Sequence, residues 1–513
     1  MMPAGTRCWW ERWPFLLALV LLSAVPLLWP ALPPLTDLPG HMGRWHISMA
    51  IGQSADLQRY YAFTWAPIGN LGMDVLVLPF AALFGIETAS KIAVTLIPLL
   101  AAAGMLWTAH EAHGRVPPTA ALALPIAYAW PFQFGFVNFE LSQALALVAF
   151  ALWLRLGRTG RLGLRAGLFA PIGCVLWLAH DFGWGLFGLM AFGAELARHR
   201  ADDGWRGWLR AVGPAIVQCL PLALPALFML LHPIHSARGL STSDWFNVRA
   251  KLLWLISIFR DRWIAIDVSM LGVALLTLYI GFRNPKLGFA PVLAIPALLC
   301  VAAFVLLPRL LLGGAYVDMR MAPIMLALGL LAIRPPADAP RLARGLALAA
   351  LAIFAVRTIA TTTSFALYAA RDDSELAALD HVPQGAAVLT LVAKQCNTAW
   401  STDRLDHLAG MAIVRRDAFV NDQWVLEGQQ LLRVRYRPAF PYVADPSQLV
   451  YPKRCPDFGS DFGRAIVGFN RRAFSYVWTL DFRPGLARVP DLALIWTNGR
   501  SALYRVVPAP TTR

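Results

Sequence analysis

The sequence has few charged residues. Charged side chains make up 15% of its 513 residues, whereas 58% are hydrophobic, and the mean hydropathy is +0.55. A soluble globular chain of this composition would expose far too much apolar surface to water. The composition therefore excludes an ordinary soluble protein and indicates a chain whose main solvent is lipid.

The signature motifs of several enzyme classes are also lacking. The sequence has no Walker-type phosphate loop, no Gly-x-Ser-x-Gly and no His-Glu-x-x-His. ATP hydrolysis, serine hydrolysis and zinc proteolysis therefore have no support. The six cysteines include no Cys-x-x-Cys pair that would indicate structural zinc.

Negative charge is scarcer than positive charge. The chain has 45 Lys and Arg against 30 Asp and Glu, which gives a net charge of +15. Much of the excess lies in short loops between apolar stretches, where the positive-inside rule accounts for it. No basic domain with a nucleic-acid motif stands out, so the expected partner is the lipid bilayer and no nucleic acid is expected.

Long apolar stretches are abundant from Pro14 to about Tyr368. A membrane-spanning helix needs about 20 mainly apolar residues. Stretches of this kind cover residues 14–32, 71–86, 89–108, 119–137, 140–156, 164–180, 183–197, 212–232, 263–282, 287–308, 315–333 and 343–369. The sequence therefore predicts an α-helical polytopic protein of the plasma (inner) membrane, with about 11–12 apolar segments.

Arginines in the connecting loops predict the orientation, because short positively charged loops stay in the cytoplasm. Such loops cover residues 155–165, 198–210, 283–286 and 334–344. The first apolar run lacks a small-residue cleavage site, which predicts an uncleaved signal anchor and a cytoplasmic N-terminus. The external segments are then 33–70, 131–140, 233–262, 309–316 and everything after about residue 370.

Twelve crossings would return the C-terminus to the cytoplasm, against the arginine pattern. We therefore expect one segment not to cross. One candidate is 71–86, which is short and contains Pro79; the other is a re-entrant 119–137, broken at Pro125 and Pro131. Either solution leaves residues 33–70 outside.

The composition becomes mixed after the last apolar segment. This change predicts a transmembrane domain at 1–369, which includes the external loop 33–70, and an extracytoplasmic soluble domain at 370–513. Strand patterns at 386–392, 439–443, 473–480 and 492–496, with helical patterns at 374–379 and 427–434, predict a small α/β domain. Cys396 and Cys455 both lie in it, and we predict a disulfide between them.

The densest polar cluster follows the first apolar segment. Asp37, His41, Arg44 and Trp45 lie within nine residues, and a helix from Gly40 onward would place the last three on one face. A carboxylate or an imidazole can act as a general base, and an arginine can bind phosphate through two hydrogen bonds. The alternative is that Asp37 only caps the helix and pairs with Arg44.

This arrangement resembles the GT-C superfamily of polyprenyl-phosphate-sugar-dependent integral membrane glycosyltransferases. The likeness covers the first span, the external loop opening on Asp37, the many spans and the C-terminal external domain. It implies that Asp37 is the catalytic carboxylate or, if a divalent cation is bound, its ligand. Many members have a paired acidic motif in this loop, whereas Asp37 has no acidic neighbour.

Five further residues are expected at the external surface as parts of a substrate-binding site. They are Asp74, His180, Arg309, Asp318 and Arg320. The arginines would supply the cations that a donor phosphate needs. Structural alternatives remain open: Asp74 can neutralise a nearby arginine, His180 can belong to an interfacial turn, and Asp318 can pair with Arg320 at a helix end.

The leading hypothesis is an enzyme. A sugar would leave a polyprenyl-phosphate donor on the external face and pass to a glycan, lipid or protein acceptor of the cell envelope. Asp37 would act as the base, His41 would orient it or bind phosphate, and Arg44, Arg309 or Arg320 would stabilise the leaving phosphate. A transporter or flippase of a lipid-linked or small solute, or a non-catalytic assembly protein of the envelope, is the alternative.

Overall fold

The chain divides into two compact units, each with its own packing. The computed structural model describes residues 8–202, 204–231, 241–334, 339–396, 399–426, 429–451, 460–482 and 489–507. The membrane unit contains residues 1–29, 68–73 and 93–364, and the α/β unit contains 30–67, 74–92 and 365–513. Most of the loop 33–70, which the sequence groups with the membrane domain, thus packs with C-terminal residues.

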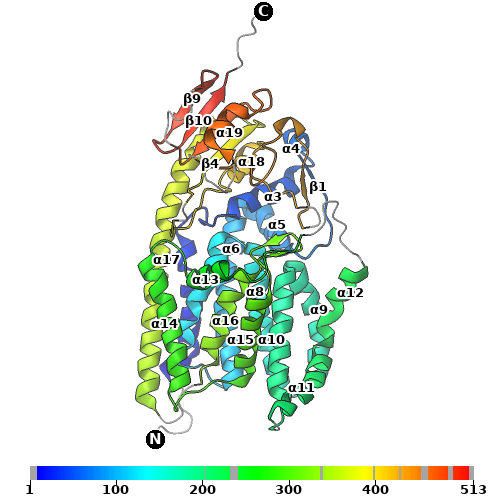
Figure 1. Ribbon diagram of the computed structural model, residues 1–513, viewed down its shortest axis with the longest axis vertical. Helices are drawn as coiled ribbons and strands as arrows, with labels where there is room; N and C mark the ends of the chain where they lie inside the picture. The colour runs from blue at the N-terminus through cyan, green and yellow to red at the C-terminus, as the bar shows by residue number, and fades with distance from the viewer. Residues whose placement is uncertain are drawn as a thin grey trace, which may run out of the picture. The chain divides into compact units, whose positions relative to one another are not determined.

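The membrane unit is built from helices (Figure 1). They are α1 (Trp13–Leu22), α2 (Val25–Leu28), α8 (Val137–Arg158), α9 (Leu162–Ala179), α10 (Asp181–His199), α11 (Gly204–Cys219), α12 (Leu224–Leu231), α13 (Val248–Ile256), α14 (Ile264–Arg283), α15 (Pro291–Leu306) and α16 (Met321–Ala332). Two more, α6 (Ile86–His113) and α17 (Pro340–Leu376), contribute residues to both units.

Six helical stretches of the described residues are long and apolar enough to cross a membrane. They are Ile86–His113, Val137–Arg158, Leu162–Ala179, Gly204–Leu230, Ile264–Arg283 and Pro340–His381. Shorter apolar helices occur at Trp13–Leu22, Gly72–Phe84 and Pro291–Leu306. The predicted polytopic helical fold with a small C-terminal sheet is confirmed.

The sequence offers residues 71–86 or residues 119–137 as the one segment that does not cross the membrane. Both segments form short helices. Residues 71–86 contain α5 (Gly72–Phe84), whose 13 residues reach only about 20 Å, less than a hydrocarbon core of about 30 Å. Residues 119–137 form η2 (Ala120–Leu122), η3 (Leu124–Tyr128) and α7 (Trp130–Phe134). Pro125 and Pro131 lie in the first turns of η3 and α7, where proline is tolerated, so the chain restarts a helix at each.

Buried ion pairs join helices of the membrane unit. Arg165 of α9 lies 2.6 Å from a carboxylate oxygen of Glu195 of α10 and 2.6 Å from Gln218 of α11. The same guanidinium lies 4.0 Å from the ring centroid of Trp153 of α8. A charge at this depth is tolerated only when paired, so this cluster fixes four helices together.

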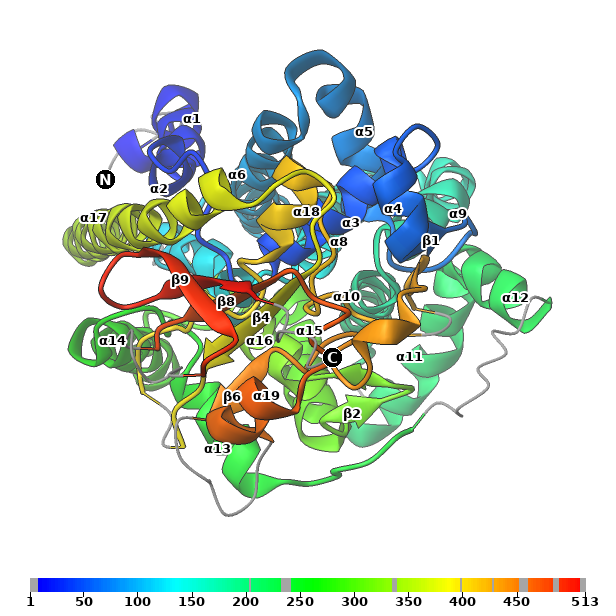
Figure 2. The same cartoon turned by 90° about the horizontal axis from the view of Figure 1, so that it is seen from above.

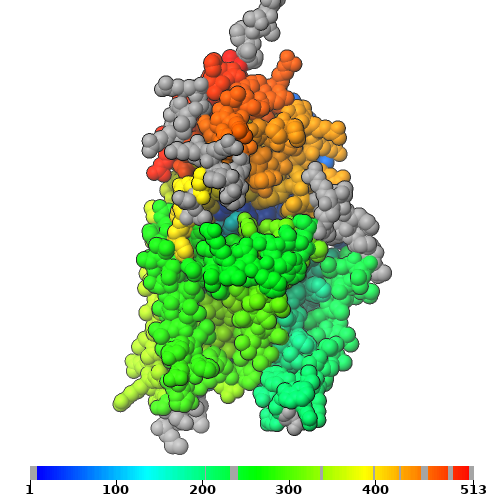
Figure 3. Space-filling view, in the orientation of Figure 1, coloured from blue at the N-terminus to red at the C-terminus, as the bar shows by residue number. Residues whose placement is uncertain are grey.

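Helix α13 presents an apolar face at the surface of the membrane unit. Val248, Leu252 and Leu253 are exposed, whereas Lys251 is buried. The segment forms part of the green surface in Figure 3. These exposed apolar side chains are suited to contact lipid.

A six-stranded mixed sheet forms the core of the α/β unit, with strand order β7-β6-β4-β8-β10-β9. The strands are β4 (Val388–Ala393), β6 (Leu449–Tyr451), β7 (Ser460–Asp461), β8 (Tyr476–Leu480), β9 (Leu492–Thr497) and β10 (Ala502–Val506). Strand β4 pairs in parallel with β6 and β8, and its buried apolar run is typical of a central strand. Figure 2 shows β9, β8, β4 and β6 in succession.

The sequence prediction of the α/β unit is right for the central strands and wrong at two places. Residues 439–443, predicted as a strand, begin with the last residue of the short helix η7 (Arg437–Ala439) and continue in turns and bends. Pro441 lacks the N–H that a strand would need. Residues 429–434, predicted as helical, contain β5 (Leu432–Val434), which pairs antiparallel with β1 (Tyr61–Phe63). The predicted helix starts at residues 427–428, which lie outside the described residues.

Cys396 is disulfide-bonded. Its predicted partner, Cys455, lies outside the described residues. The other four cysteines, Cys8, Cys174, Cys219 and Cys300, are free.

Close glycine contacts dock helix α3 (Leu38–Ala50) on α18 (Gly410–Arg416) in the α/β unit. A Cβ atom on Gly410 would lie 2.9 Å from Cα of Gly40, and one on Gly43 would lie 3.0 Å from Ile413. These distances are shorter than ordinary van der Waals contact. The two backbones therefore approach each other only because side chains are absent at these positions.

We expect Gly410→Ala to destabilise the α/β unit, although alanine normally favours a helix. The added methyl group overpacks the contact with α3, which costs about 1–3 kcal/mol. The thermal unfolding midpoint of the purified full-length protein should fall by about 2–4 °C for each kcal/mol. Gly468→Ala, in α19 (Phe462–Gly468), is the matched control because a Cβ there meets nothing within 4 Å. Equal midpoints for the two variants would contradict this packing.

Candidate active site

Asp37 occupies the N-cap position of α3 in the α/β unit, yet its carboxylate makes no capping hydrogen bond among the described residues. Its backbone carbonyl accepts the first helical bond, from the N–H of His41, at 3.1 Å. The preceding residue anchors the chain, because the Thr36 hydroxyl donates to the carbonyl of Asp403 at 2.7 Å. The Asp37 side chain is only 9% exposed. The buried carboxylate therefore does something other than cap the helix.

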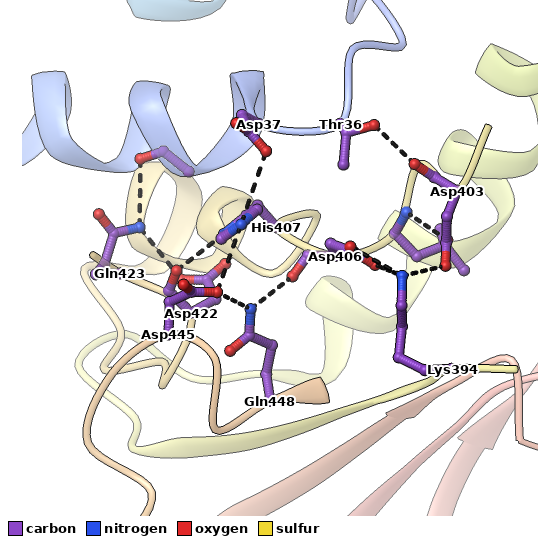
Figure 4. Close-up of polar contacts among 12 residues, drawn as sticks. Thr36, Asp37, Lys394, Asp403, Asp406, His407, Asp422, Gln423, Asp445 and Gln448 are labelled. Carbon is purple, nitrogen blue, oxygen red and sulfur yellow. Dashed lines mark hydrogen bonds and ion pairs between the residues drawn. The ribbon is translucent and has the colours of Figure 1, made fainter. Parts of the chain in front are cut away.

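A histidine from the C-terminal part of the chain faces this carboxylate. Nε2 of His407 lies 3.8 Å from Oδ1 of Asp37 and 3.7 Å from Oδ1 of Asp445 (Figure 4). Its Nδ1 lies 2.9 Å from the carbonyl oxygen of Asp422. Because a carbonyl only accepts hydrogen bonds, Nδ1 must donate, and in the neutral ring Nε2 keeps its lone pair. Burial lowers the pKa of His407, which favours this neutral form.

Further buried carboxylates surround the pair. Burial raises the pKa of Asp422 to about 8, so this side chain is mainly protonated at neutral pH. Burial also raises the pKa of Asp406 to about 6. Lys394 lies between Asp403 at 2.7 Å and Asp406 at 2.9 Å. Burial alone would lower the pKa of Lys394, but the two carboxylates raise it more, so it stays charged.

The predicted site residue His41 lies against aromatic rings on α3 and the loop that follows α18. Its ring centroid is 4.9 Å from that of Trp424 and 6.0 Å from that of Trp45. Trp424 also packs on His407, at 4.1 Å. His407 lies beside Asp37, and the catalytic role of His41 stays a prediction.

Arg44 and Asp74 form a buried bidentate ion pair. Nε and Nη2 of Arg44 donate to the two carboxylate oxygens of Asp74 at 3.0 and 2.7 Å, and Nη1 donates to Gln430. Both side chains of the pair are 3% exposed. Asp74 thus neutralises a nearby arginine, which was the structural interpretation of this residue, and Arg44 does not pair with Asp37 in any described contact.

The membrane unit brings two other predicted residues together. Nη1 of Arg320 lies 3.1 Å from Nε2 of His180. The guanidinium also lies over the rings of Phe136 and Phe139, at 4.6 and 5.2 Å from their centroids. A cation held by aromatic faces and an imidazole is a suitable place for an anionic group.

Two remaining predicted residues have partners that the sequence did not indicate. Asp318 is fully buried and lies 3.1 Å from Nζ of Lys251 on α13. Asp318 therefore pairs with Lys251 and anchors α13. The structural alternative from the sequence, a pair between Asp318 and Arg320, is wrong. Arg309 lies 3.2 Å from Asp244, and this pair is partly exposed.

The described residues contain no group of three or more His, Cys, Asp or Glu side chains that could hold a metal ion. The divalent cation that the family resemblance allows, with Asp37 as ligand, therefore has no candidate ligand set among these residues.

Sequence reasoning missed His407, Asp422, Trp424 and Asp445. They lie far from Asp37 along the chain, in loops without a regular pattern, so no spacing rule relates them to it. The available signal is a single histidine that directly follows Asp406, with Asp403 three residues before that aspartate, ahead of the apolar stretch of α18. That signal is too weak to identify a site.

Comparisons with known proteins show the fold. No family model matches the sequence, and no curated protein matches it. The chain superimposes on the crystal structure of ArnT from Cupriavidus metallidurans in the apo state, with 15% identity, 96% of this chain and 97% of that chain covered, and a TM-score of 0.50. The structure of the same protein described as bound to undecaprenyl phosphate aligns with 16% identity, the same coverage and a TM-score of 0.48. The likeness to the apo structure shows that the two chains share a fold, which agrees with the predicted polytopic helical fold with a small C-terminal α/β domain.

We expect Asp74→Asn to lower the yield of folded protein sharply, because it leaves the Arg44 guanidinium buried without its counter-charge. Such a loss costs about 3–5 kcal/mol. The matched control is Glu87→Gln. It breaks a bidentate pair with Arg415 of similar geometry, at 2.9 Å for both bonds, whose side chains are 40% and 34% exposed. An exposed pair contributes less than about 1 kcal/mol. Comparable losses in size-exclusion profile and unfolding midpoint for both variants would refute a special role for burial.

Proposed function

We propose that this chain, whose fold is that of the GT-C glycosyltransferases, moves a sugar from a polyprenyl-phosphate donor to an acceptor hydroxyl of the cell envelope. The observation that carries the proposal is the buried carboxylate of Asp37, which is not used for helix capping and lies beside the ring nitrogen of His407. A buried carboxylate next to a neutral imidazole is suited to accept a proton.

The proposed reaction is a displacement at the anomeric carbon of the sugar. The acceptor oxygen attacks this carbon, and the bond to the phosphate oxygen of the donor breaks. Asp37 takes the proton from the acceptor hydroxyl, which becomes more acidic as its oxygen shares an electron pair with the anomeric carbon. Orienting the hydroxyl and accepting its proton in a site shielded from water supports such a step.

Arg320 is the proposed contact for the donor phosphate. Its guanidinium lies against His180 and over two phenylalanine rings, a setting that suits an anionic group. Arg44 is held by Asp74 in a buried bidentate pair, and Arg309 lies in a partly exposed pair with Asp244. Of the three arginines considered from the sequence, we therefore assign the phosphate contact to Arg320, because of its aromatic and imidazole surroundings.

The location follows from the topology proposed from the arginine-rich loops. The N-terminus would be cytoplasmic, and the α/β unit with Asp37 would lie on the external, periplasmic side of the inner membrane. The acceptor would then be a glycan, lipid or protein of the envelope.

We expect Asp37→Asn to reduce sugar transfer by about 10²- to 10⁴-fold, the usual contribution of a positioned general base. Purified protein in lipid nanodiscs would be given radiolabelled polyprenyl-phosphate sugars together with envelope extracts as acceptor. Asp491→Asn is the control, because Asp491 is an aspartate of the same unit that pairs with Arg471 instead. Transfer by Asp37→Asn at the control rate would disprove the role of Asp37; no transfer by the wild type with several donors would disprove the proposed function.

We expect Arg320→Ala to raise the KM for the donor by about 10- to 100-fold, because a hydrogen bond to a charged group contributes about 1.5–3 kcal/mol. The KM for the acceptor should change little. Arg249→Ala, at an exposed arginine of α13, controls for the general loss of positive charge. A donor KM that is the same in the two variants would remove Arg320 from the proposed phosphate contact.

A further inference from the structure

We infer that His407 is a positioning residue that receives the proton from Asp37 during sugar transfer, with Asp445 stabilising the imidazolium that forms. This inference rests on the proposed function. It brings the C-terminal part of the chain into the reaction, although the family resemblance that the sequence suggests points only to the first external loop.

The His407 ring is held in one orientation. Its Nδ1 donates to the carbonyl of Asp422 at 2.9 Å, and its face packs on Trp424 with centroids 4.1 Å apart. Gly40 of α3 leaves room for this packing, because a Cβ there would lie 2.9 Å from the Trp424 ring and 3.2 Å from Cβ of His407. Nε2 is therefore the one ring nitrogen available to the carboxylates.

Two carboxylates converge on that nitrogen from different segments. Asp37 lies at the start of α3, and Asp445 lies in the loop before β6, with Oδ1 atoms 3.8 and 3.7 Å from Nε2. The Asp445 carboxylate is further fixed by Gln448, whose amide donates to Oδ1 at 2.8 Å. An imidazolium at this place would lie between two negative charges.

The other groups around His407 oppose its protonation before turnover. Burial lowers its pKa most, and the positive charge of Lys394 lowers it further, whereas Asp445 and the Asp422 carbonyl raise it. The Asp422 side chain is mainly protonated at neutral pH, and Asp406 forms an ion pair with Lys394. His407 is therefore neutral in the resting protein and able to take a proton.

The proposed reaction balances in protons and electrons without another reactant. The acceptor oxygen forms a bond to the anomeric carbon, and the donor phosphate leaves with the electron pair of the bond that breaks. The acceptor proton passes to Oδ1 of Asp37 and then to Nε2 of His407, once the 3.8 Å between these two atoms has shortened to hydrogen-bond length in the substrate complex. Asp37 becomes a carboxylate again, and His407 later releases the proton to water. The carboxylates of Asp37 and Asp445, which both lie near Nε2, stabilise the imidazolium that the second transfer forms.

The test compares His407→Gln with His46→Gln over a range of pH in the transfer assay. His46 is a second histidine of the same unit, paired with Asp417 at 2.7 Å, and has no role in the relay. We expect His407→Gln to lower kcat by about 10²-fold with little change in KM. Wild-type kcat should fall with decreasing pH as His407 becomes protonated. Because burial lowers the pKa of His407, this fall should occur at a pH below the ordinary histidine pKa. It should disappear in His407→Gln. If His407 were merely structural, His407→Gln would leave the pH dependence of kcat unchanged.

Asp445→Asn provides a second test that keeps the side-chain shape. It removes the negative charge of Asp445 from beside His407, which lowers the pKa of His407 further, so the fall of kcat at acid pH should move to lower pH. At neutral pH, kcat should fall by about 10-fold, because the imidazolium loses a stabilising charge. A wild-type pH profile in both variants, with Asp37→Asn inactive, would overturn the relay and leave the proposed function standing. No transfer by the wild type would overturn both.

Discussion

The contact between α3 and the C-terminal segment around α18 is the constraint on which the candidate site depends. Gly40, Gly43 and Gly410 let two backbones approach more closely than side chains would permit. This approach places Asp37, at the first residue before α3, beside His407, which is distant in sequence. The first loop and the C-terminal domain are therefore one structural unit, and the site belongs to both segments.

The distances around buried charges separate structural pairs from the candidate site. Arg44 with Asp74 and Arg165 with Glu195 make short ion pairs of 2.7 and 2.6 Å, as buried charges need for stability. His407 lies 3.7–3.8 Å from two carboxylates, which is too long for a hydrogen bond. The structural charges thus lie in short ion pairs, whereas His407 lies near the Asp37 and Asp445 carboxylates at distances longer than a hydrogen bond. Proton exchange between these groups requires the distances to shorten to hydrogen-bond length when the substrates bind.

Parts of this picture were predictable from the sequence, where the signal is local. Composition predicts the membrane helices, and the buried apolar run of β4 predicts a strand at the centre of the sheet. Spacing correctly placed His41, Arg44 and Trp45 on one helix. Non-local partners were not predictable: β5 forms a strand only because β1 pairs with it, and Asp318 pairs with Lys251 instead of Arg320. His407 belongs to the same class, because only tertiary packing brings it to Asp37.

The central claim is that the polyprenyl-phosphate bond to the sugar is broken during turnover. Mass spectrometry of the lipids after incubating the purified protein with donor and acceptor measures this directly. The account predicts that free polyprenyl phosphate appears in proportion to the sugar transferred, and that Asp37→Asn suppresses both. An intact lipid-linked sugar that merely crosses the bilayer would contradict the account and identify a transporter instead.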